Sequence, residues 1–439
     1  MKTLSDIRRH TYVLTAVVAV GFCGSELRAQ PSRHEFVRFD SFMERTRAAR
    51  LENPAHEEMR QHILNTYREV PVTHSFLWGS SHFDCIPVMQ QPAAKETGLN
   101  NIAAQPPDSV LASPAGEHAG ARRGGLLKKL SRGRSADEFG NSLACEEGTV
   151  PMRRLTLDEM TRFHSLREYF QKGPNGAGQP AEEGSDEPAA TASEAHKYSY
   201  MTQTVDNLGG SSTLNIWRPY VDTSKGEVFS LSQEWYVGGT GTSTQTAEVG
   251  WQNFPGHYGD QNSRLFIYWT MDGYKTSGCY NMECNMFYQT SSEMPLGADF
   301  GDAYSTVGGD QYEFSAEFYL YEGNWWLNVD GTWIGYYPGS IYKGGQLTKH
   351  AQKIQFGSES VGTTMYPPEG SGHFSKDGYG QAAYQRNLFY FPTNGDAAWD
   401  KLTPQNPSPG CYTVSGQNTS TTSGWSVYFL EGGPGGSGC

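Results

Sequence analysis

No stretch of the 439-residue sequence is apolar for long enough to cross a bilayer, and the run at residues 12–22 is too short to do so. Lys2, Arg8 and Arg9 precede that run, and the polar segment ending in Leu27-Arg28-Ala29 follows it. This is the layout of a secretory signal peptide. We therefore expect residues 1–29 to be removed and the protein to be secreted, into the medium or into the periplasm of a Gram-negative bacterium, without a membrane-bound part.

Basic residues are scarce in the second part of the chain. From Lys197 onward there are 11 Lys and Arg against 22 Asp and Glu, a net charge of −11 out of −13 for the chain. Nine of the ten tryptophans also lie there. Such a surface repels nucleic acids and anionic membranes, so neither is expected as a partner. The same scarcity limits positive self-repulsion when carboxylates become neutral in acid.

The signatures of the commonest hydrolases are missing as well. Residues 196–439 contain no Gly-x-Ser-x-Gly turn, and the histidines after residue 197 (His257, His350 and His373) are scattered. In the N-terminal part, the sequence from His56 to Arg60 begins like a zinc-protease motif but lacks the second histidine. Serine, cysteine and zinc mechanisms are therefore disfavoured, and we expect neither a metal nor a cofactor.

Six cysteines remain after the signal peptide: Cys85, Cys145, Cys279, Cys284, Cys411 and Cys439. An even number in an oxidising compartment favours disulfides over metal ligation. The two central cysteines, five residues apart, would close a tight loop, and the last two would tie the C-terminal residue to the rest. The first two are then left over, and their pairing stays open.

The pattern of apolar residues divides the chain. Residues 33–70 have helical spacing, and residues 30–170 as a whole read as a mixed, partly helical segment with a basic patch at 122–134. Residues 171–195 have almost no apolar bulk and predict a disordered linker. After residue 196 the period becomes two, which predicts an all-β sandwich of antiparallel strands over 196–439. Its clearest strand-like runs are 213–217, 233–237, 265–269, 314–320, 325–329, 353–356 and 426–429.

Two glutamates stand out in this β region. Glu248 lies in a strand-like run between Ala247 and Val249, and Glu359 ends another run among small residues. A lone glutamate in a strand usually points to solvent, but small neighbours also let a substrate backbone approach a carboxylate. With other catalytic groups missing, the pair is the best candidate for chemistry.

Several short motifs make the sequence recognisable. In the N-terminal segment they are Phe83-Asp84-Cys85-Ile86-Pro87, Gln91-Pro92-Ala93 and Gly148-Thr149-Val150-Pro151. In the β region they are Glu248-Val249-Gly250-Trp251, Gly278-Cys279-Tyr280-Asn281, Gly335-Tyr336-Tyr337-Pro338, Gly357-Ser358-Glu359, Gly370-Ser371-Gly372-His373 and Gly432-Gly433-Pro434-Gly435. Together they resemble the neprosin family of secreted glutamic peptidases over nearly the whole chain after the signal peptide.

The resemblance implies a curved double-sheet sandwich at 196–439, with Glu248 and Glu359 as the catalytic pair. It also implies a zymogen whose activation propiece is residues 30–170, and cleavage after proline in acid. The substrates would then be proline-rich proteins or peptides, and the propiece would act as an intramolecular inhibitor of a monomeric enzyme. Ser358 departs from the family pattern, which has a second glycine there.

The chemistry of two facing carboxylates agrees with this assignment. Carboxyl groups that share a site titrate at separated pKa values, so one can accept a proton from water while the other donates one to a carbonyl oxygen. Gln233, Trp251 and Tyr274 are candidates for oxyanion or subsite contacts. Two alternatives stay open: a non-catalytic glycan-binding sandwich with exposed aromatic residues, and a glycosidase that uses the same two carboxylates.

Overall fold

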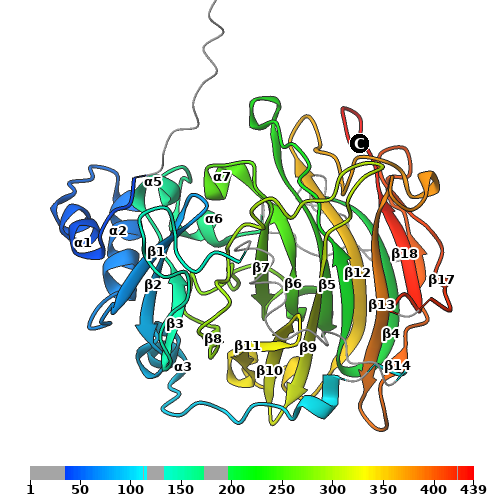
Figure 1. Ribbon diagram of the computed structural model, residues 1–439, viewed down its shortest axis with the longest axis horizontal. Coiled ribbons are helices and arrows are strands. Elements are labelled where there is room, and N and C mark those ends of the chain that lie inside the picture. Colours follow the sequence, from blue (N-terminus) through cyan, green and yellow to red (C-terminus); the bar gives the residue numbers. More distant parts are fainter. Residues whose placement is uncertain (1–34, 112, 116–132, 173–195, 423) are drawn as a thin grey trace, which may run out of the picture. The chain divides into compact units, whose positions relative to one another are not determined.

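The computed structural model describes residues 35–111, 113–115, 133–172, 196–422 and 424–439 (Figure 1). The chain divides into the units Met1–Glu35 and Phe36–Cys439, and every helix and strand described here belongs to the second. The expected signal peptide and most of the basic patch at 122–134 lie outside the described residues. Among the helices of the described residues, none is long and apolar enough to span a membrane.

Residues 36–172, the N-terminal part, combine short helices with a small sheet. Two helices fall inside the stretch that the sequence predicts as helical, and the second begins at Pro54 with the Asn53 side chain accepting a 2.9 Å hydrogen bond from the Ala55 amide. The three strands form an antiparallel sheet in the order β1-β2-β3. The elements are α1 (Phe39–Ala48), α2 (Pro54–Thr66), β1 (His74–Trp78), β2 (Ser81–Pro87), α3 (Pro92–Thr97), β3 (Thr149–Arg153), α5 (Leu157–Met160) and α6 (Leu166–Phe170).

Residues 196–439, the C-terminal part, form a 15-stranded antiparallel sheet that is folded into two layers. One layer has the order β7-β6-β5-β12-β4, and the other continues as β4-β9-β10-β11-β8, with β13 and β18 beyond β4. The strands are β4 (His196–Asn215), β5 (Glu227–Gly238), β6 (Gln245–Asn253), β7 (Arg264–Thr270), β8 (Tyr288–Gln289), β9 (Glu313–Tyr321), β10 (Asn324–Val329), β11 (Thr332–Pro338), β12 (Ala351–Gly362), β13 (Ala383–Pro392), β14 (Ala398–Trp399), β15 (Thr403–Gln405), β16 (Thr413–Val414), β17 (Asn418–Thr419) and β18 (Val427–Gly432). A short helix, α7 (Pro255–Tyr258), joins β6 to β7.

Strand β4 belongs to both layers. Its first half pairs with β12 and its second half with β9, and the change of partner occurs at Asn207–Gly209. Gly209 has a φ of +121°, and a Cβ atom there would lie 1.9 Å from the carbonyl oxygen of Phe318. Only glycine therefore lets β4 pass from one layer into the other.

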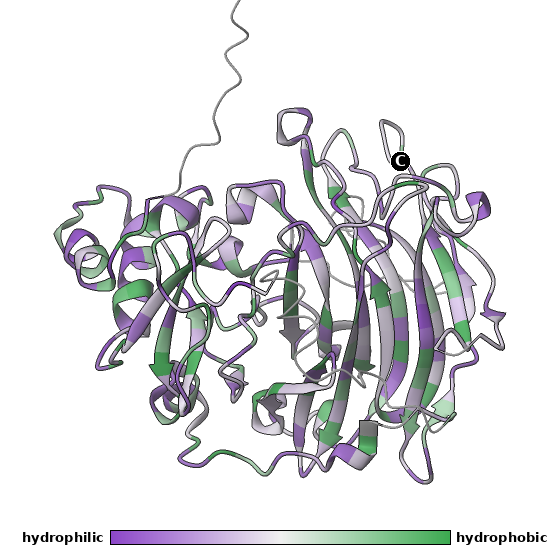
Figure 2. Cartoon of the chain, in the orientation of Figure 1, coloured by the Kyte–Doolittle hydropathy of each residue, from purple (hydrophilic) through white to green (hydrophobic). Residues whose placement is uncertain are grey.

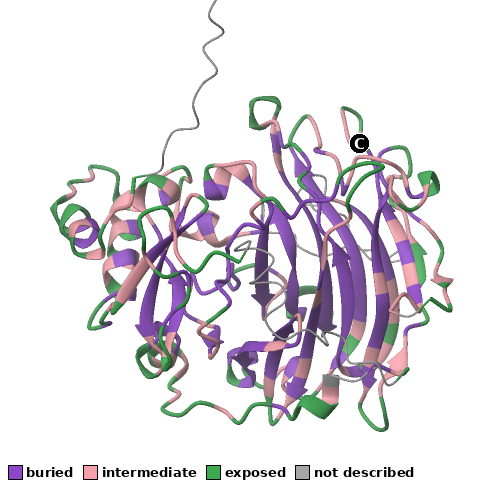
Figure 3. Cartoon of the chain, in the orientation of Figure 1, coloured by how far each residue is buried: buried purple, intermediate pink, exposed green. Residues whose placement is uncertain are grey.

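The core lies between the layers, where alternate residues of facing strands meet. The ring of Tyr236 in β5 lies 5.9 Å from Phe318 in β9 and 6.0 Å from Trp325 in β10. Figure 3 shows β6 and β7 as fully buried and other strands as partly exposed, and Figure 2 shows hydrophilic and hydrophobic bands along the strands. The all-β, antiparallel double-sheet fold expected from the sequence is confirmed.

The structure corrects the expected linker at its start. Residues 171–195 read as disordered, but Lys172 is fully buried. A lysine among polar residues is usually exposed to solvent, so the sequence pattern predicts an exposed side chain here. Lys172 is buried instead, because it pairs with two buried carboxylates. The remaining linker residues, 173–195, lie outside the described residues.

Candidate active site

Glu248 and Glu359 lie on the two strands that flank β5. Strand β6 carries Glu248 and β12 carries Glu359, and their partners on β5 are four residues apart, so both side chains share one face of the layer. Gln233 lies midway along β5, opposite Gly250 on one side and Gly357 on the other. Because neither glycine has a side chain, a space remains above the sheet between the two carboxylates.

The side chain of Lys172 fills this space. Its Nζ lies 2.7 Å from Oε2 of Glu248 and 2.9 Å from Oε2 of Glu359, and all three side chains have no exposed surface. The structure thus brings the two predicted glutamates together through one shared ammonium group. The Nζ also lies 5.3 to 6.0 Å from the centres of three rings: Trp235, Tyr268 and Phe266.

Glu248 receives hydrogen bonds from its own strand and from its neighbours. Oε1 accepts from the hydroxyls of Thr246, at 2.7 Å, and Tyr274, at 2.6 Å. Oε2 accepts from the Gln233 amide at 2.9 Å. With the ammonium of Lys172, four donors hold this carboxylate in one orientation. Gln233 and Tyr274, both predicted as site residues, therefore contact Glu248.

Glu359 has a different set of neighbours. His196, the first residue of β4, places Nδ1 2.6 Å from Oε1 of Glu359. Tyr198 pairs with Glu359 across the two strands, and burial together with the nearby carboxylate raises the pKa of this tyrosine well above its usual value. Sequence reasoning missed His196, because the histidines were considered only after residue 197 and no motif marks this one.

Trp251 lies outside the site, so its predicted contact role is wrong. It is three positions from Glu248 in the same strand, and an odd spacing in a strand places two side chains on opposite faces. Its indole N–H donates to the Asn215 carbonyl at 2.9 Å within the core. Ser358 faces the opposite side of the sheet from Glu359, because it precedes Glu359 by one residue in β12. Its departure from the family pattern therefore lies outside the site.

All six cysteines that follow the expected signal peptide are paired. Disulfides join Cys279 to Cys284 and Cys411 to Cys439, as the spacing predicted, and Cys85 to Cys145, the pair left open by the sequence. The last of these holds β2 to the loop before β3. Among the described residues, no group of three or more His, Cys, Asp or Glu side chains could hold a metal ion.

The segment that leads to Lys172 is anchored beside the site. Arg153 donates to Glu283 at 2.9 Å, and the Tyr169 ring stacks on His257 with centroids 4.4 Å apart. The Phe170 carbonyl accepts from the Tyr268 hydroxyl at 3.1 Å. Burial by itself would raise the pKa of Glu283, but His257 and Arg153 lower it to about 2. The anchor at Glu283 therefore stays charged in moderately acidic solution.

Within the part of the chain that the structure describes, five other buried carboxyl groups have no cation beside them. Burial raises the pKa of Glu234 to about 8 and that of Glu431 to about 7, although hydroxyl donors counteract it. Burial also raises the pKa values of Glu317, Glu369 and Asp400 well above the usual range. These five groups hold their protons in the folded state at pH values where an unfolded chain has lost them.

We expect the folded protein to be most stable in acid and to lose stability as the pH rises from about 4.5 to 8. Within this window the unfolded state binds fewer protons than the folded state, so the free energy of unfolding falls with pH. Glu431 alone, with a pKa of about 7, would contribute a loss on the order of 3 kcal/mol. Urea unfolding at pH 4, 6 and 8 measures the effect. The double variant Glu234→Gln/Glu431→Gln should flatten the profile, and an unchanged slope would contradict this explanation.

Comparison with known families supports the family resemblance. A family model described as Neprosin matches residues 226–434. The chain is similar to a scytalido-glutamic peptidase solved with a transition state analog inhibitor, at 8% identity and a TM-score of 0.29 over 54% of this chain and 98% of that one. It is also similar to sheep galectin-11, at 14% identity and a TM-score of 0.20 over 37% and 93%. A laminarinase catalytic domain from Thermotoga petrophila matches at 12% identity and a TM-score of 0.24 over 54% and 68%.

These structural similarities have low scores and do not decide the activity of this chain. The match of the family model covers Glu248, Glu359 and every strand of the C-terminal part except β4. Residues 226–434 therefore match the neprosin family, the family that the sequence motifs resemble.

Proposed function

We propose that the protein is a secreted glutamic peptidase made as a zymogen, with Glu248 and Glu359 as its catalytic dyad. The observation that carries the proposal is the shared site: two fully buried carboxylates hold one ammonium nitrogen at 2.7 and 2.9 Å. A position within hydrogen-bond reach of both carboxylates suits a water molecule and a scissile carbonyl once Lys172 has left. The three disulfides fit an oxidising compartment.

In this mechanism the two carboxyl groups share one proton. The ionised glutamate takes a proton from water as the water oxygen attacks the carbonyl carbon, and the protonated glutamate donates to the carbonyl oxygen. The tetrahedral intermediate then collapses: the C–N bond breaks, and the proton gained from water passes to the leaving amine. The hydroxyl group formed from the carbonyl oxygen returns its proton to the second glutamate as the C=O bond forms again. Tyr274 and Gln233 contact Glu248 and are suitably placed to stabilise developing negative charge.

Residues 30 to 172 would serve as the inhibitory propiece in this proposal. Lys172 occupies the space between the glutamates, and residues 153–170 hold it there through Arg153, Tyr169 and Phe170. Substrate cannot reach either carboxylate while the ammonium is bound. Cleavage within 173–195 would free this segment from β4, so maturation removes the lysine together with the propiece.

The preference for proline follows from the family resemblance and from the rings beside the dyad. Trp235, Phe266 and Tyr268 surround the position of the Lys172 ammonium. Once the lysine has left, they offer an apolar wall to the pyrrolidine ring of a proline next to the scissile bond. A peptide series with proline, alanine or leucine before the scissile bond would measure the preference as a ratio of kcat/KM values.

We expect the mature enzyme to show a bell-shaped pH profile of kcat/KM with both limbs below neutrality. Protonation of the base abolishes activity on the acid side, and ionisation of the acid partner abolishes it on the other. The profile is measured on a proline-containing peptide, with serine, cysteine and metal inhibitors as controls. An optimum above pH 7 (about the value of a histidine-dependent enzyme) would refute the shared-proton dyad. Cleavage of a polysaccharide in place of the peptide would favour the glycosidase.

Maturation is tested separately. After acid treatment, mass spectrometry of the active protein should find a new N-terminus within residues 173–195 and a separate propiece. A fully active sample whose N-terminus is still near Gln30 would show that residues 30–172 do not inhibit the enzyme. The peptidase assignment could survive that result, because it depends on the dyad and not on the propiece.

A further inference from the structure

The second layer of the sheet carries an aromatic surface on the side that faces away from the core. In β8, β10 and β11 one aromatic residue points into the core and its neighbour points outward, as in the pairs Trp325–Trp326 and Tyr337–Tyr336. The outward rings lie close together, with centroids 5.4 Å apart for Tyr288 and Tyr336 and 4.6 Å apart for Trp326 and Tyr336. We call Tyr288, Trp326, Trp333 and Tyr336 the aromatic platform.

The N-terminal part covers this platform. Ala93 belongs to the same apolar cluster, and Val88, Leu99 and Val110 pack against it. The Tyr288 hydroxyl donates to the Val88 carbonyl at 3.0 Å, and the Ala103 amide donates to the Tyr336 hydroxyl at 3.1 Å. In Figure 1 the chain that follows α3 runs past the ends of β10 and β9. As a result no platform ring is more than 5% exposed.

A glutamine side chain completes the edge of the sheet beside the platform. Within the described residues, β8 pairs with β11 alone, so its other edge has no strand partner. The Gln91 amide takes that place: its Nε2 donates to the Gln289 carbonyl at 2.7 Å, and its Oε1 accepts from the Gln289 amide at 2.9 Å. Gln91 and the following Pro92 and Ala93 are buried. A primary amide thus satisfies both backbone groups of Gln289, as a residue of an added strand would.

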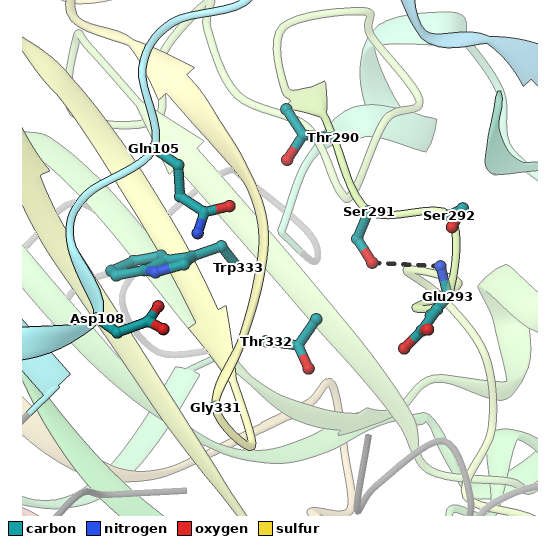
Figure 4. Close-up of a pocket in the computed structure, with 9 residues that line it drawn as sticks. All are labelled: Gln105, Asp108, Thr290, Ser291, Ser292, Glu293, Gly331, Thr332 and Trp333. Atoms are coloured by element: carbon teal, nitrogen blue, oxygen red, sulfur yellow. Dashed lines mark hydrogen bonds between the residues drawn. The ribbon is translucent and has the colours of Figure 1, made fainter. Parts of the chain in front are cut away.

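A pocket extends the platform. It has a volume of about 760 Å³ and is lined by Gln105 and Asp108 of the N-terminal part and by Trp333 and residues 290–293 of the C-terminal part. Figure 4 shows Gln105 and Asp108 beside the Trp333 ring. The indole nitrogens of Trp326 and Trp333 are buried and have no hydrogen-bond partner among the residues that the structure describes. An additional ligand group therefore has space beside the Trp333 ring.

We infer that loss of the propiece uncovers a second peptide-binding surface, formed by the aromatic platform and the Gln289 edge, which binds Gln-Pro segments of protein substrates. The inference rests on the proposed removal of the propiece. A large apolar patch on a free protein is usually a binding site, and this one would lose its cover at maturation. Its present occupant, Gln91-Pro92-Ala93, shows which chemistry fits: a side-chain amide on the edge, followed by proline and a small residue.

Binding at this surface would tether long substrates without touching the dyad. Proteins that contain Gln-Pro segments should then have a lower KM than short peptides with the same scissile bond, because a second contact raises the effective concentration of the chain near the site. The value of kcat should not change, since no platform residue contacts either glutamate.

The test uses the processed enzyme and a synthetic peptide with the sequence of residues 87–103. We expect the peptide to bind with a change in tryptophan fluorescence, and the same peptide carrying Gln91→Ala to bind at least ten times more weakly. In the enzyme, Trp333→Ala and the milder Trp333→Phe should raise KM for a long Gln-Pro protein at least fivefold. Their kcat/KM for a short peptide should match that of the wild type.

Absence of peptide binding, binding of a soluble β-glucan in its place, or equal KM changes for long and short substrates would each overturn the inference. Mass spectrometry of the processed enzyme is an independent check. If residues 87–103 stay bound after cleavage, the platform is a permanent core and is not a binding surface. An enzyme that binds the peptide but does not cleave the short substrate would instead refute the proposed peptidase function alone.

Discussion

Replacing Glu248 or Glu359 by glutamine is expected to lower kcat/KM at least ~10³-fold, as is usual when one member of a catalytic unit is removed. Glutamine keeps the shape of the side chain, but it neither accepts a proton from water nor gives one to a carbonyl oxygen. The hydrogen bonds from Thr246 and Tyr274 to residue 248 can largely remain. The fold should therefore survive, and a normal melting curve is part of the expected result.

Both variants would fail to process themselves if maturation is autocatalytic, so the propiece must be removed in another way. The linker contains glutamates at positions 182, 183 and 194 that are not followed by proline. A glutamyl endopeptidase can cut the chain after these residues, and this added protease is then removed before the assay. The matched control is Glu431→Gln, a buried strand glutamate that accepts from Ser232 at 2.7 Å and lies on β18, away from the dyad. It should keep nearly full activity in acid. Full activity in Glu248→Gln would refute the dyad.

Replacing Lys172 by methionine is expected to make the uncut protein process itself at least ~10²-fold faster at about pH 5–6. Removing one partner of a buried ion pair costs about 3–5 kcal/mol, and each 1.36 kcal/mol is tenfold in an equilibrium constant. The bound state of residues 153–172 loses that stabilisation. The variant lacks the two ion pairs that join Lys172 to Glu248 and Glu359, so its propiece release should also depend less on pH.

The measurement is the initial rate of propiece release, followed by gel electrophoresis between pH 3 and 7. Lys95→Met is the matched control, because the Lys95 ammonium donates to the Arg68 carbonyl on the surface of the N-terminal part and touches neither glutamate. That variant should process like the wild type. A Lys172→Met protein that stays latent for as long as the wild type would show that other contacts, such as Arg153 with Glu283, are sufficient for inhibition.

Much of the fold could be predicted from the sequence. Period-two patterns mark strands wherever one face is apolar, and most of the predicted runs lie within observed strands such as β5, β7, β9 and β10. The first half of β4 and the whole of β13 were not predicted as strands. Polar residues such as Gln203 and Gln385 interrupt the apolar pattern there, and the layers bury polar as well as apolar side chains. Alternation of polarity therefore fails as a guide in these strands.

The site could be predicted only in part, because some of its residues carry no sequence signal. Glu248 and Glu359 stood out as carboxylates in strand-like runs, and family motifs linked them, but only the register across β5 shows that Gln233 lies between them. Lys172 and His196 had no such signal. Lys172 lies near the start of the polar segment 171–195, and His196 follows its end. The composition there predicts exposure to solvent, and only the fold brings the two side chains to the carboxylates.

The position of His196 has a practical consequence for purified enzyme. It is the first residue of β4 and contacts Glu359, so any cut within 173–195 leaves a short N-terminal overhang of at most 23 residues next to the dyad. A preparation cut at several points would be a mixture of enzymes that differ in the length and charge of this overhang. Variation between batches in KM or in pH optimum should then follow the distribution of N-termini. A preparation cut at a single position would give one enzyme with one set of kinetic constants.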